Sequence, residues 1–298
     1  MSTTHADPAG TDLDVVMLAK DEAINLPHSL PSVVPWARRV FVVDSGSTDA
    51  TEEVVREQGG EFVHRPWLGY AKQKNWALDH LPLEAAWTLI LDADEIITDE
   101  LRDEIIALTR RDPETVQQDG FYINRYFIFL GKRIRHCGFY PSWNLRLFKR
   151  GKARYEERDV HEHMILDGPT AHLKGHMEHH DRRGLEVYMA KHNHYSTLEA
   201  REIDRVIRGQ STATLDAKPF GNSLQRRRWI KHVVYPRLPA KWLFRFAFMY
   251  IARLGFLDGL TGLRFCLFMS AYELLIDLKL LELRIERTPA ESPARSST

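Results

Sequence analysis

Acidic residues follow three short apolar segments in the first third of the sequence, and their type and spacing suggest chemistry. LDVVML is followed by Lys20-Asp21-Glu22, RRVFVV by Asp44, and WTLIL by Asp92-Ala93-Asp94-Glu95. Carboxylates can bind hydroxyl groups, base N–H groups or a hard cation. Each group could also be an ordinary turn or helix cap, because Asp is favoured in both places. Three such groups at matching positions favour a functional site.

Asp92 and Asp94 form the sharpest of these features. Two carboxylates one residue apart on an extended turn can both face Mg²⁺ or Mn²⁺, which prefer oxygen ligands and substrate phosphates. Phosphatases of the haloacid-dehalogenase type have the same local pattern, but there it follows the first strand, whereas here it follows the fourth apolar segment. Neither GxGxxG nor GxxxxGK[ST] occurs, so the phosphate cradles of dinucleotide-binding and P-loop proteins are not expected.

The segments that must position these residues alternate between strand and helix patterns. Strands are expected at LDVVML, RRVFVVD, EFVHR and WTLILD, and later at GFYINRYFIFL and NLRLFKR. Helices are expected at DATEEVV, capped by Ser47 or Thr48 and ended by Gly59-Gly60, at residues 69–80, and after the cap Thr98. This order predicts an α/β fold with a mostly parallel sheet flanked by helices, whose carboxyl strand ends meet at one edge.

We divide the 298 residues into four parts. Residues 1–12 and 286–298 are expected to be disordered, 13–200 to form the α/β domain, and 201–285 to form a helical region rich in basic and aromatic residues. Two cysteines, Cys137 and Cys266, cannot build a disulfide framework, which suits a reducing compartment. The first residues contain no apolar stretch typical of a secretory signal.

The helical region carries an unusual charge distribution. Lys+Arg and Asp+Glu both total 41, but residues 217–257 hold nine basic residues and no acidic one. Within that stretch Lys241, Arg245 and Arg253 are expected on one side of a helix that begins near Pro239. No uncharged apolar run of 18 residues occurs, so we expect a membrane-associating helix at an anionic surface rather than a spanning one. A helix packed on the catalytic domain is the alternative, and no recognition motif supports nucleic-acid binding.

The motifs VVDSGSTDAT, LGYAKQKNWAL and LDADE, with Lys20-Asp21-Glu22, resemble those of family 2 glycosyltransferases of the GT-A (Rossmann-like) fold. The likeness covers roughly residues 13–200 and is greatest for the lipopolysaccharide and lipooligosaccharide core β-glucosyltransferases. It implies an inverting, metal-dependent enzyme that uses a nucleotide sugar, usually a UDP-sugar. It also implies residue roles: Glu22 and Asp44 at the nucleoside, Lys72 and Asn75 along the donor, Asp92 at ribose or metal, and Asp94 on the metal. His179 or His180, of which we favour His180, would complete the coordination.

Inversion in one step needs a carboxylate base beside the acceptor hydroxyl, whose pKa lies far above 7. Many members of the family supply it from a Glu-Asp pair that this sequence lacks. Similarity to the core-glucosyltransferase branch points instead to Glu162 as the base, Asp159 as second candidate, and His161 as a positioning or phosphate-binding group. Glu162 could alternatively pair with an arginine in a loop. Eight of the fourteen histidines lie between His161 and His194, but their spacing matches no zinc motif.

The resulting hypothesis is a glycosyltransferase that uses Mg²⁺ or Mn²⁺ and moves a hexose such as glucose from a nucleotide sugar to a lipid-linked saccharide, such as lipopolysaccharide core. We expect it in the cytoplasm, peripheral on the cytoplasmic face of the inner membrane. A polyprenyl-phosphate-linked acceptor is the alternative within the class. A non-catalytic glycan- or lipid-binding module and a phosphate-ester hydrolase are the alternatives outside it.

Overall fold

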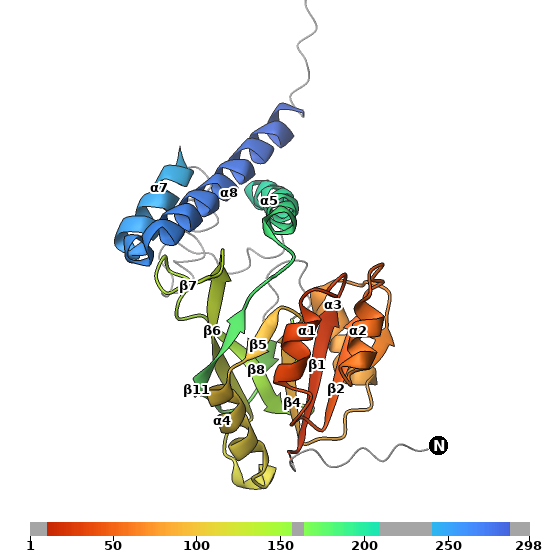
Figure 1. Ribbon diagram of the computed structural model, residues 1–298. Coiled ribbons are helices and arrows are strands. Elements are labelled where there is room, and N and C mark those ends of the chain that lie inside the picture. Colours follow the sequence, from red (N-terminus) through yellow and green to blue (C-terminus); the bar gives the residue numbers. More distant parts are fainter. Residues whose placement is uncertain (1–10, 157–163, 209–239, 287–298) are drawn as a thin grey trace, which may run out of the picture. The chain divides into compact units, whose positions relative to one another are not determined.

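The computed structural model describes residues 11–156, 164–208 and 240–286, and these form two compact units that divide after Gly184 (Figure 1). The expected boundary at residue 200 falls inside the first helix of the second unit, α5 (Leu185–Ile207). Each unit is described by itself below.

The first unit contains a nine-stranded sheet of order β3-β2-β1-β4-β8-β6-β11-β5, with β7 paired to β6. Its first four strands are parallel and match the four expected segments: β1 (Leu13–Ala19), β2 (Arg39–Asp44), β3 (Glu61–His64) and β4 (Trp87–Asp92). The helical segments between them are α1 (Leu26–Ser29), η1 (Leu30–Ser32), α2 (Thr51–Glu57) and α3 (Tyr70–His80).

The rest of the sheet is mixed rather than parallel. β8 runs antiparallel to β4, β6 antiparallel to β8, and β11 parallel to β6. The elements are β5 (Glu95–Ile97), α4 (Asp99–Thr109), η2 (Pro113–Thr115), β6 (Gly120–Phe129), β7 (Lys132–Ile134), β8 (Trp143–Lys149) and β11 (Thr170–His179), with a separate pair β9 (Ala153–Tyr155) and β10 (Met164–Leu166). β6 and β8 were expected from the sequence, whereas β11 was not. Its alternation of buried Leu173, Gly175 and Met177 with polar residues is the period of a strand with one buried face.

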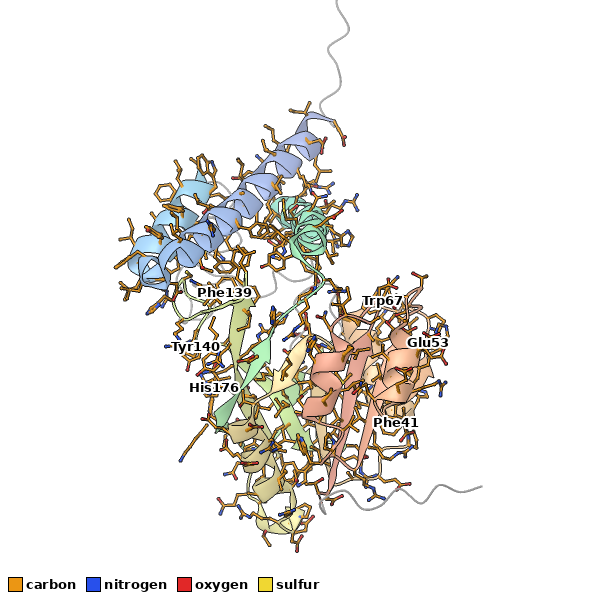
Figure 2. All side chains as sticks on the ribbon, in the orientation of Figure 1. Phe41, Glu53, Trp67, Phe139, Tyr140 and His176 are labelled. Carbon is orange, nitrogen blue, oxygen red and sulfur yellow. The ribbon has the colours of Figure 1, made fainter. Side chains whose placement is uncertain are left out.

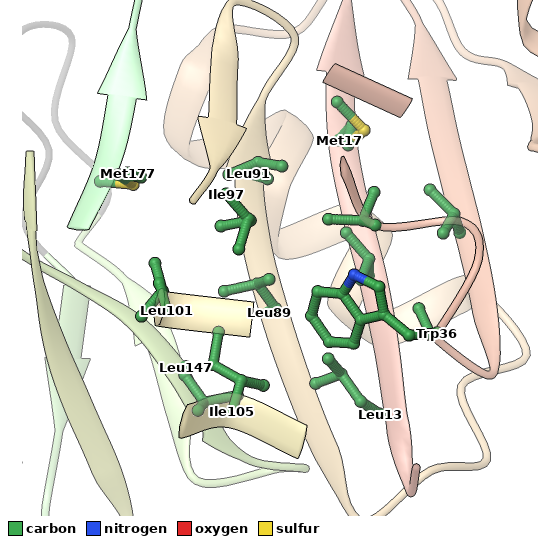
Figure 3. Packing of buried hydrophobic residues seen from close by; sticks show 14 of the residues in the cluster. Leu13, Met17, Trp36, Leu89, Leu91, Ile97, Leu101, Ile105, Leu147 and Met177 are labelled. Carbon is green, nitrogen blue, oxygen red and sulfur yellow. The ribbon is translucent and has the colours of Figure 1, made fainter. Parts of the chain in front are cut away.

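Apolar residues pack on both faces of the parallel strands, which explains their nearly continuous apolar sequences. Leu13 and Met17 of β1 enter the cluster shown in Figure 3, together with Leu89 and Leu91 of β4. Val16, between them in β1, packs in the cluster on the opposite face. The sheet that positions the candidate site is therefore held from both sides.

The helix caps agree with the sequence in one case and differ in another. Thr98 caps α4 as expected, since its Oγ1 accepts a hydrogen bond from the Leu101 N–H at 3.4 Å. The sequence predicted Ser47 or Thr48 as the cap of α2, but neither residue caps it. α2 begins at Thr51, whose N–H donates to Asp49 Oδ1 at 3.1 Å. Ser47 and Thr48 are engaged in the loop between β2 and α2 instead.

The described residues of the second unit are largely helical up to Ile285, as expected. Their elements are α5, α7 (Lys241–Ala247), a π-helical turn η6 (Phe248–Ala252), η7 (Gly255–Asp258) and α8 (Gly259–Ile285). α5 packs against α8 through Ala200, Ile276 and Leu280. Lys279 of α8 strengthens this contact because its Nζ donates to Asn193 O at 2.7 Å and to Ser196 Oγ at 2.8 Å.

The expected helix with Lys241, Arg245 and Arg253 on one outward side is wrong. Lys241 is fully buried, with its Nζ 2.7 Å from Asp277 Oδ1 and 3.4 Å from Glu273 Oε1. α7 ends at Ala247, so Arg253 lies beyond the helix, next to Leu254, which has a positive φ of 55°. The acidic residues that draw Lys241 inward lie about thirty residues further along the chain and are invisible to local periodicity.

Large apolar side chains of this unit are exposed instead. We call this set the apolar surface; its members are Leu243, Phe244, Phe248, Ile251, Leu254, Phe256, Leu257, Leu260, Leu267, Leu275, Leu278, Leu281 and Ile285. Within the described residues, Gly255–Ile285 is long and apolar enough to cross a membrane by length and composition, with a mean hydropathy of 1.3 over its best window. We did not expect a helix of this kind from the sequence, because charged residues interrupt its apolar run.

Candidate active site

The carboxyl ends of β1, β2 and β4 are level in the sheet, as expected. In the register of the sheet, Ala19 of β1 lies beside Asp44 of β2, and Leu18 of β1 lies beside Asp92 of β4. The three acidic segments therefore leave the sheet at one edge. Asp44, Asp92 and Asp94 come together because the strands that precede them have matching registers.

The loops after β1 and β2 are joined by hydrogen bonds between side chains and backbone. The N–H of Asp21 donates to Ser47 Oγ at 2.7 Å, and the N–H of Thr48 donates to Asp21 Oδ1 at 2.8 Å. The N–H of Glu22 donates to Thr51 Oγ1 at 2.9 Å. These contacts fix the two loops as one rigid wall of the site.

Asp44 is buried, and its carboxylate holds the turn that follows it. Its Oδ2 accepts hydrogen bonds from the N–H of Gly46 at 2.8 Å and of Ser47 at 3.0 Å, while the Ser47 hydroxyl donates to Oδ1. Gly46 has a φ of 94°, a conformation that favours glycine. The described contacts of Asp44 thus hold the loop, and the role implied for it at the nucleoside stays a prediction.

Asp92 lies beside two cations that the sequence did not identify. Arg146 Nη2, on β8, lies 2.6 Å from Asp92 Oδ2 and 2.7 Å from Glu95 Oε1, and it is buried with Glu95. Lys74 Nζ, on α3, lies 3.8 Å from Asp92 Oδ1. Burial acts to raise the pKa of Asp92, but Arg146 and Lys74 outweigh it and hold that pKa well below its usual range. Asp92 is therefore ionised at neutral pH.

α3 presents Lys74 to the site rather than Lys72. Lys72 is exposed, whereas Lys74 is buried, with its ammonium 4.7 Å from the centre of the Tyr155 ring. Asn75 holds β9, the strand that carries Tyr155. Its Nδ2 donates to Tyr155 O at 2.9 Å, and its Oδ1 accepts from the Tyr155 N–H at 2.8 Å. The described contacts of Asn75 are thus structural, and they hold Lys74 in place.

Asp94 is paired with a histidine of β11. His179 Nε2 lies 3.0 Å from Asp94 Oδ2, while the backbone N–H of the next residue, His180, donates to Asp94 O at 2.8 Å. Of the two histidines considered as metal ligands, His179 is thus the one beside the Asp94 carboxylate, and the favoured His180 contacts Asp94 through its backbone.

Glu22 has an unusual environment for a carboxylate. It is buried, accepts a hydrogen bond from Asn25 Nδ2 at 2.7 Å and lies 2.9 Å from Arg183 Nη1. Arg183 is shared with Asp181, which lies 2.6 Å from it. Burial is the main influence and raises the pKa of Glu22 to about 7, against the effects of Asn25 and Arg183. Glu22 is poised to change protonation near neutral pH.

The residues proposed for base catalysis, Asp159, His161 and Glu162, lie outside the described residues. Within the described part of the chain, no group of three or more His, Cys, Asp or Glu could hold a metal ion by itself. Asp94 and His179 nevertheless supply one carboxylate and one imidazole at 3.0 Å. This pair fits a Mg²⁺ or Mn²⁺ whose other ligands are substrate phosphates and water, the usual mode of binding for these ions. The histidine-rich segment gives no zinc site among the described residues.

Sequence signals for the missed residues exist but are weak. Arg146 interrupts the apolar strand NLRLF, and a charge on a buried strand is rare unless it is paired. Lys74 lies two positions from Lys72 in KQK, and the sequence did not show which of the two lysines faces the site. Nothing in the sequence around Arg183 indicated that this residue lies at the site.

Comparisons with known proteins identify similar sequences. A family model described as glycosyl transferase family 2 matches residues 14–165. The chain is 33% identical over 168 residues to the lipopolysaccharide core biosynthesis glycosyltransferase LpsC of Rhizobium meliloti, covering 54% of this chain and 60% of that protein. It is 39% identical over 93 residues to an uncharacterized glycosyltransferase of Rickettsia bellii, covering 31% of each. The matched stretches thus span less than two thirds of these relatives.

Among solved structures, TarS residues 1–349 of S. aureus in complex with UDP resembles the chain with a TM-score of 0.42, at 13% identity and covering 93% of each chain. The match of the family model covers half of the sequence, including β1, β2, β4 and the Asp92–Asp94 turn. The α/β unit has a mixed sheet flanked by helices, with four parallel strands at β3, β2, β1 and β4. The chain therefore belongs to glycosyl transferase family 2.

Proposed function

We propose that this protein is an inverting hexosyltransferase that takes a sugar such as glucose from a UDP-sugar and transfers it to a lipid-linked saccharide. The family assignment supports sugar transfer, and the name of the relative LpsC supports an acceptor of the lipopolysaccharide core type. The observation that carries the proposal is the grouping of Asp92, Asp94 and His179 with the cations Lys74 and Arg146 at the carboxyl edge of the sheet.

This grouping suits a nucleoside diphosphate. Asp94 and His179 would hold Mg²⁺ or Mn²⁺, which, when bound, neutralises charge on the departing diphosphate. Lys74 and Arg146 contribute fixed positive charge at the same edge, and Arg146 cannot be deprotonated. The ion pairs of Arg146 with Asp92 and Glu95 hold its guanidinium in place before the donor binds, so its position needs no reorganisation.

The acidic residues have a different task in this proposal. Asp92 is ionised and more than a third exposed, so it can accept hydrogen bonds from ribose hydroxyls or contact the metal. Glu22 belongs to the loop wall formed with the β2 turn, where the resemblance places the nucleoside. Asn75 and Asp44 stay predicted donor-site residues, although both also support the loops and α3. We propose Lys74 in place of the exposed Lys72 for contact with the donor.

The acceptor hydroxyl needs a base. We assign this task to Glu162, with Asp159 as second candidate and His161 as a positioning or phosphate-binding group. In the one-step displacement, the acceptor oxygen bonds to the anomeric carbon, the bond to the diphosphate breaks, and the hydroxyl proton passes to the carboxylate.

The enzyme is proposed to work in the cytoplasm at the inner membrane, where a lipid-linked acceptor is available. A polyprenyl-phosphate-linked acceptor is the alternative substrate, since the described residues contain nothing that selects the lipid. A non-catalytic glycan-binding role is disfavoured by the retained Asp92, Asp94 and His179 cluster.

A panel of nucleotide sugars tests the proposal. The full chain is incubated with each donor and Mn²⁺ or Mg²⁺, and release of the nucleoside diphosphate is followed with and without a saccharide acceptor. We expect one UDP-hexose to react, and Asp94→Asn to abolish the reaction. Asp103→Asn, which changes an exposed aspartate on α4, is the matched control and should keep full activity. Equal activity of Asp94→Asn at limiting metal would refute the metal assignment, and no reaction with any donor would refute the proposed function.

A further inference from the structure

The second unit exposes many large apolar side chains on its described helices α7 and α8. We propose that it enters one leaflet of a lipid bilayer through the apolar surface, and that burial of apolar side chains in the hydrocarbon, rather than attraction of basic residues to anionic lipid, dominates the binding. The inference rests on the proposed function only for the location of the acceptor, and it adds the mode of membrane binding.

α8 is apolar on both sides. Its buried side combines apolar residues such as Phe265 with the polar Ser270 and the charged Glu273. Its exposed side includes Leu267 and Leu278, at 52% and 53% exposure. A helix on the surface of a soluble domain normally directs its apolar stripe inward. Here the leucines face outward along the helix, as they do where the surroundings are lipid.

A charged group inside the unit is paired there. Lys241 is fully buried and lies between Glu273 and Asp277 of α8. A buried charge is strongly unfavourable unless it is paired, and these contacts pair it. The positive charge of Lys241 is thus neutralised within the protein rather than offered to an anionic membrane.

The segment before α8 presents a further group of exposed apolar side chains. Phe244 lies on α7, and Phe248 and Ile251 lie on η6. Their exposures are 59%, 48% and 63%. Contiguous exposed apolar groups of this kind mark interaction surfaces. Their continuity in sequence with the long apolar helix Gly255–Ile285 favours hydrocarbon as the occupant.

The depth of insertion follows from lengths and charges. α7 and η6 together extend only ~18 Å, whereas the hydrocarbon core of a bilayer is about 30 Å thick. α8 is long enough to cross, but it carries exposed charges at Glu282 and Arg284, which favour a position along the surface. Arg253 and Arg264 are exposed beside the apolar residues, and long basic side chains reach toward head groups from a shallow position. An in-plane position in one leaflet satisfies both constraints, as for interfacial helices generally.

Vesicle co-sedimentation of the full chain tests this mode of binding. The probes are vesicles of phosphatidylcholine alone and of phosphatidylcholine with phosphatidylglycerol, each in 0.1 M and 1 M NaCl. We expect binding to both vesicle types and survival of most binding at 1 M salt, where attraction between exposed charges is screened beyond about 3 Å. Loss of binding to neutral vesicles, or release at 1 M salt, would overturn the proposal in favour of electrostatic docking.

Two variants separate the contributions. Phe244→Ser/Phe248→Ser/Ile251→Ser should lower the partition coefficient by at least about 100-fold, since each large apolar side chain buried contributes roughly tenfold. The matched variant Arg253→Gln/Arg264→Gln should change it by less than about fivefold. All these side chains are exposed, so folding is expected to survive and is checked by circular dichroism. The reverse ranking would refute the proposal.

Sedimentation without lipid excludes the main competing occupant. If a second copy of the chain covers the apolar surface, the wild type is a dimer and the triple serine variant is a monomer. The variant then binds vesicles as well as the wild type does. That result would overturn the proposal. Nucleotide release with a soluble acceptor is measured in parallel. A membrane-binding failure with normal transfer refutes only this inference, whereas failure of transfer with normal binding refutes only the proposed function.

Discussion

Glu22 gives the most direct test of the electrostatics of the candidate site. Its pKa rises from 4.5 to about 7 in the folded protein because it is buried, although Asn25 and Arg183 act against the rise. Between these two pH values the folded protein binds a proton at Glu22 that the unfolded chain does not. The free energy of unfolding therefore falls as pH rises through this window.

The size of the effect follows from the two pKa values. A change of one unit corresponds to about 1.36 kcal/mol, so the full rise corresponds to roughly 3 kcal/mol between about pH 4 and pH 8. Glu22→Gln removes the titration and keeps an acceptor oxygen for Asn25. Relative to wild type, this variant should thus gain about 3 kcal/mol as pH is raised across the window.

The assay is urea unfolding of the full chain at several pH values, with the α/β unit followed by hydrogen–deuterium exchange in β1 and β4. The control is Glu53→Gln, which changes an exposed glutamate in the first turn of α2 (Figure 2). Its stability difference from wild type should stay constant with pH. A constant difference for Glu22→Gln as well would show that Arg183 keeps Glu22 ionised at pH 5, and would refute the argument from burial.

Three further predictions address the donor, the base and the helical unit. Lys74→Met should weaken UDP-sugar binding at least about tenfold, while Lys72→Met changes it less than about threefold, as measured by titration calorimetry; equal losses would contradict the assignment of Lys74 to the site. Glu162→Gln should lower the transfer rate roughly 10²–10⁴-fold at nearly unchanged donor affinity, and Asp159→Asn much less; the opposite order in a soluble-acceptor assay would move the base to Asp159. Lys241→Met should destabilise residues 185–286 by about 3 kcal/mol in hydrogen exchange of α8, because it leaves buried Glu273 without its partner. Arg201→Met, at an exposed position of α5, is the control and should have little effect.

Much of the α/β unit follows from local sequence. The segments LDVVML, RRVFVVD and WTLILD predict β1, β2 and β4 because strands buried on both faces need continuous apolar residues. The position of the acidic turns after them follows from strand length and turn chemistry. The common edge for Asp44, Asp92 and Asp94 then follows from parallel pairing, which right-handed crossover connections impose. These features were predictable because each depends on neighbours in the chain or on general rules of chain connection.

Only the tertiary structure decided which partners these residues have. Arg146 lies 54 residues from Asp92 along the chain, and His179 lies 85 residues from Asp94, so no local pattern could join them. β11, which carries His179, has few apolar residues and gained its strand form by pairing with β6 and β5. Likewise, the sequence of residues 241–253 predicted outward basic residues, because periodicity shows which side chains share a face but not which way the face turns. Lys241 turned inward because Glu273 and Asp277 lie there to pair with it, and the phenylalanines and leucines were left outside.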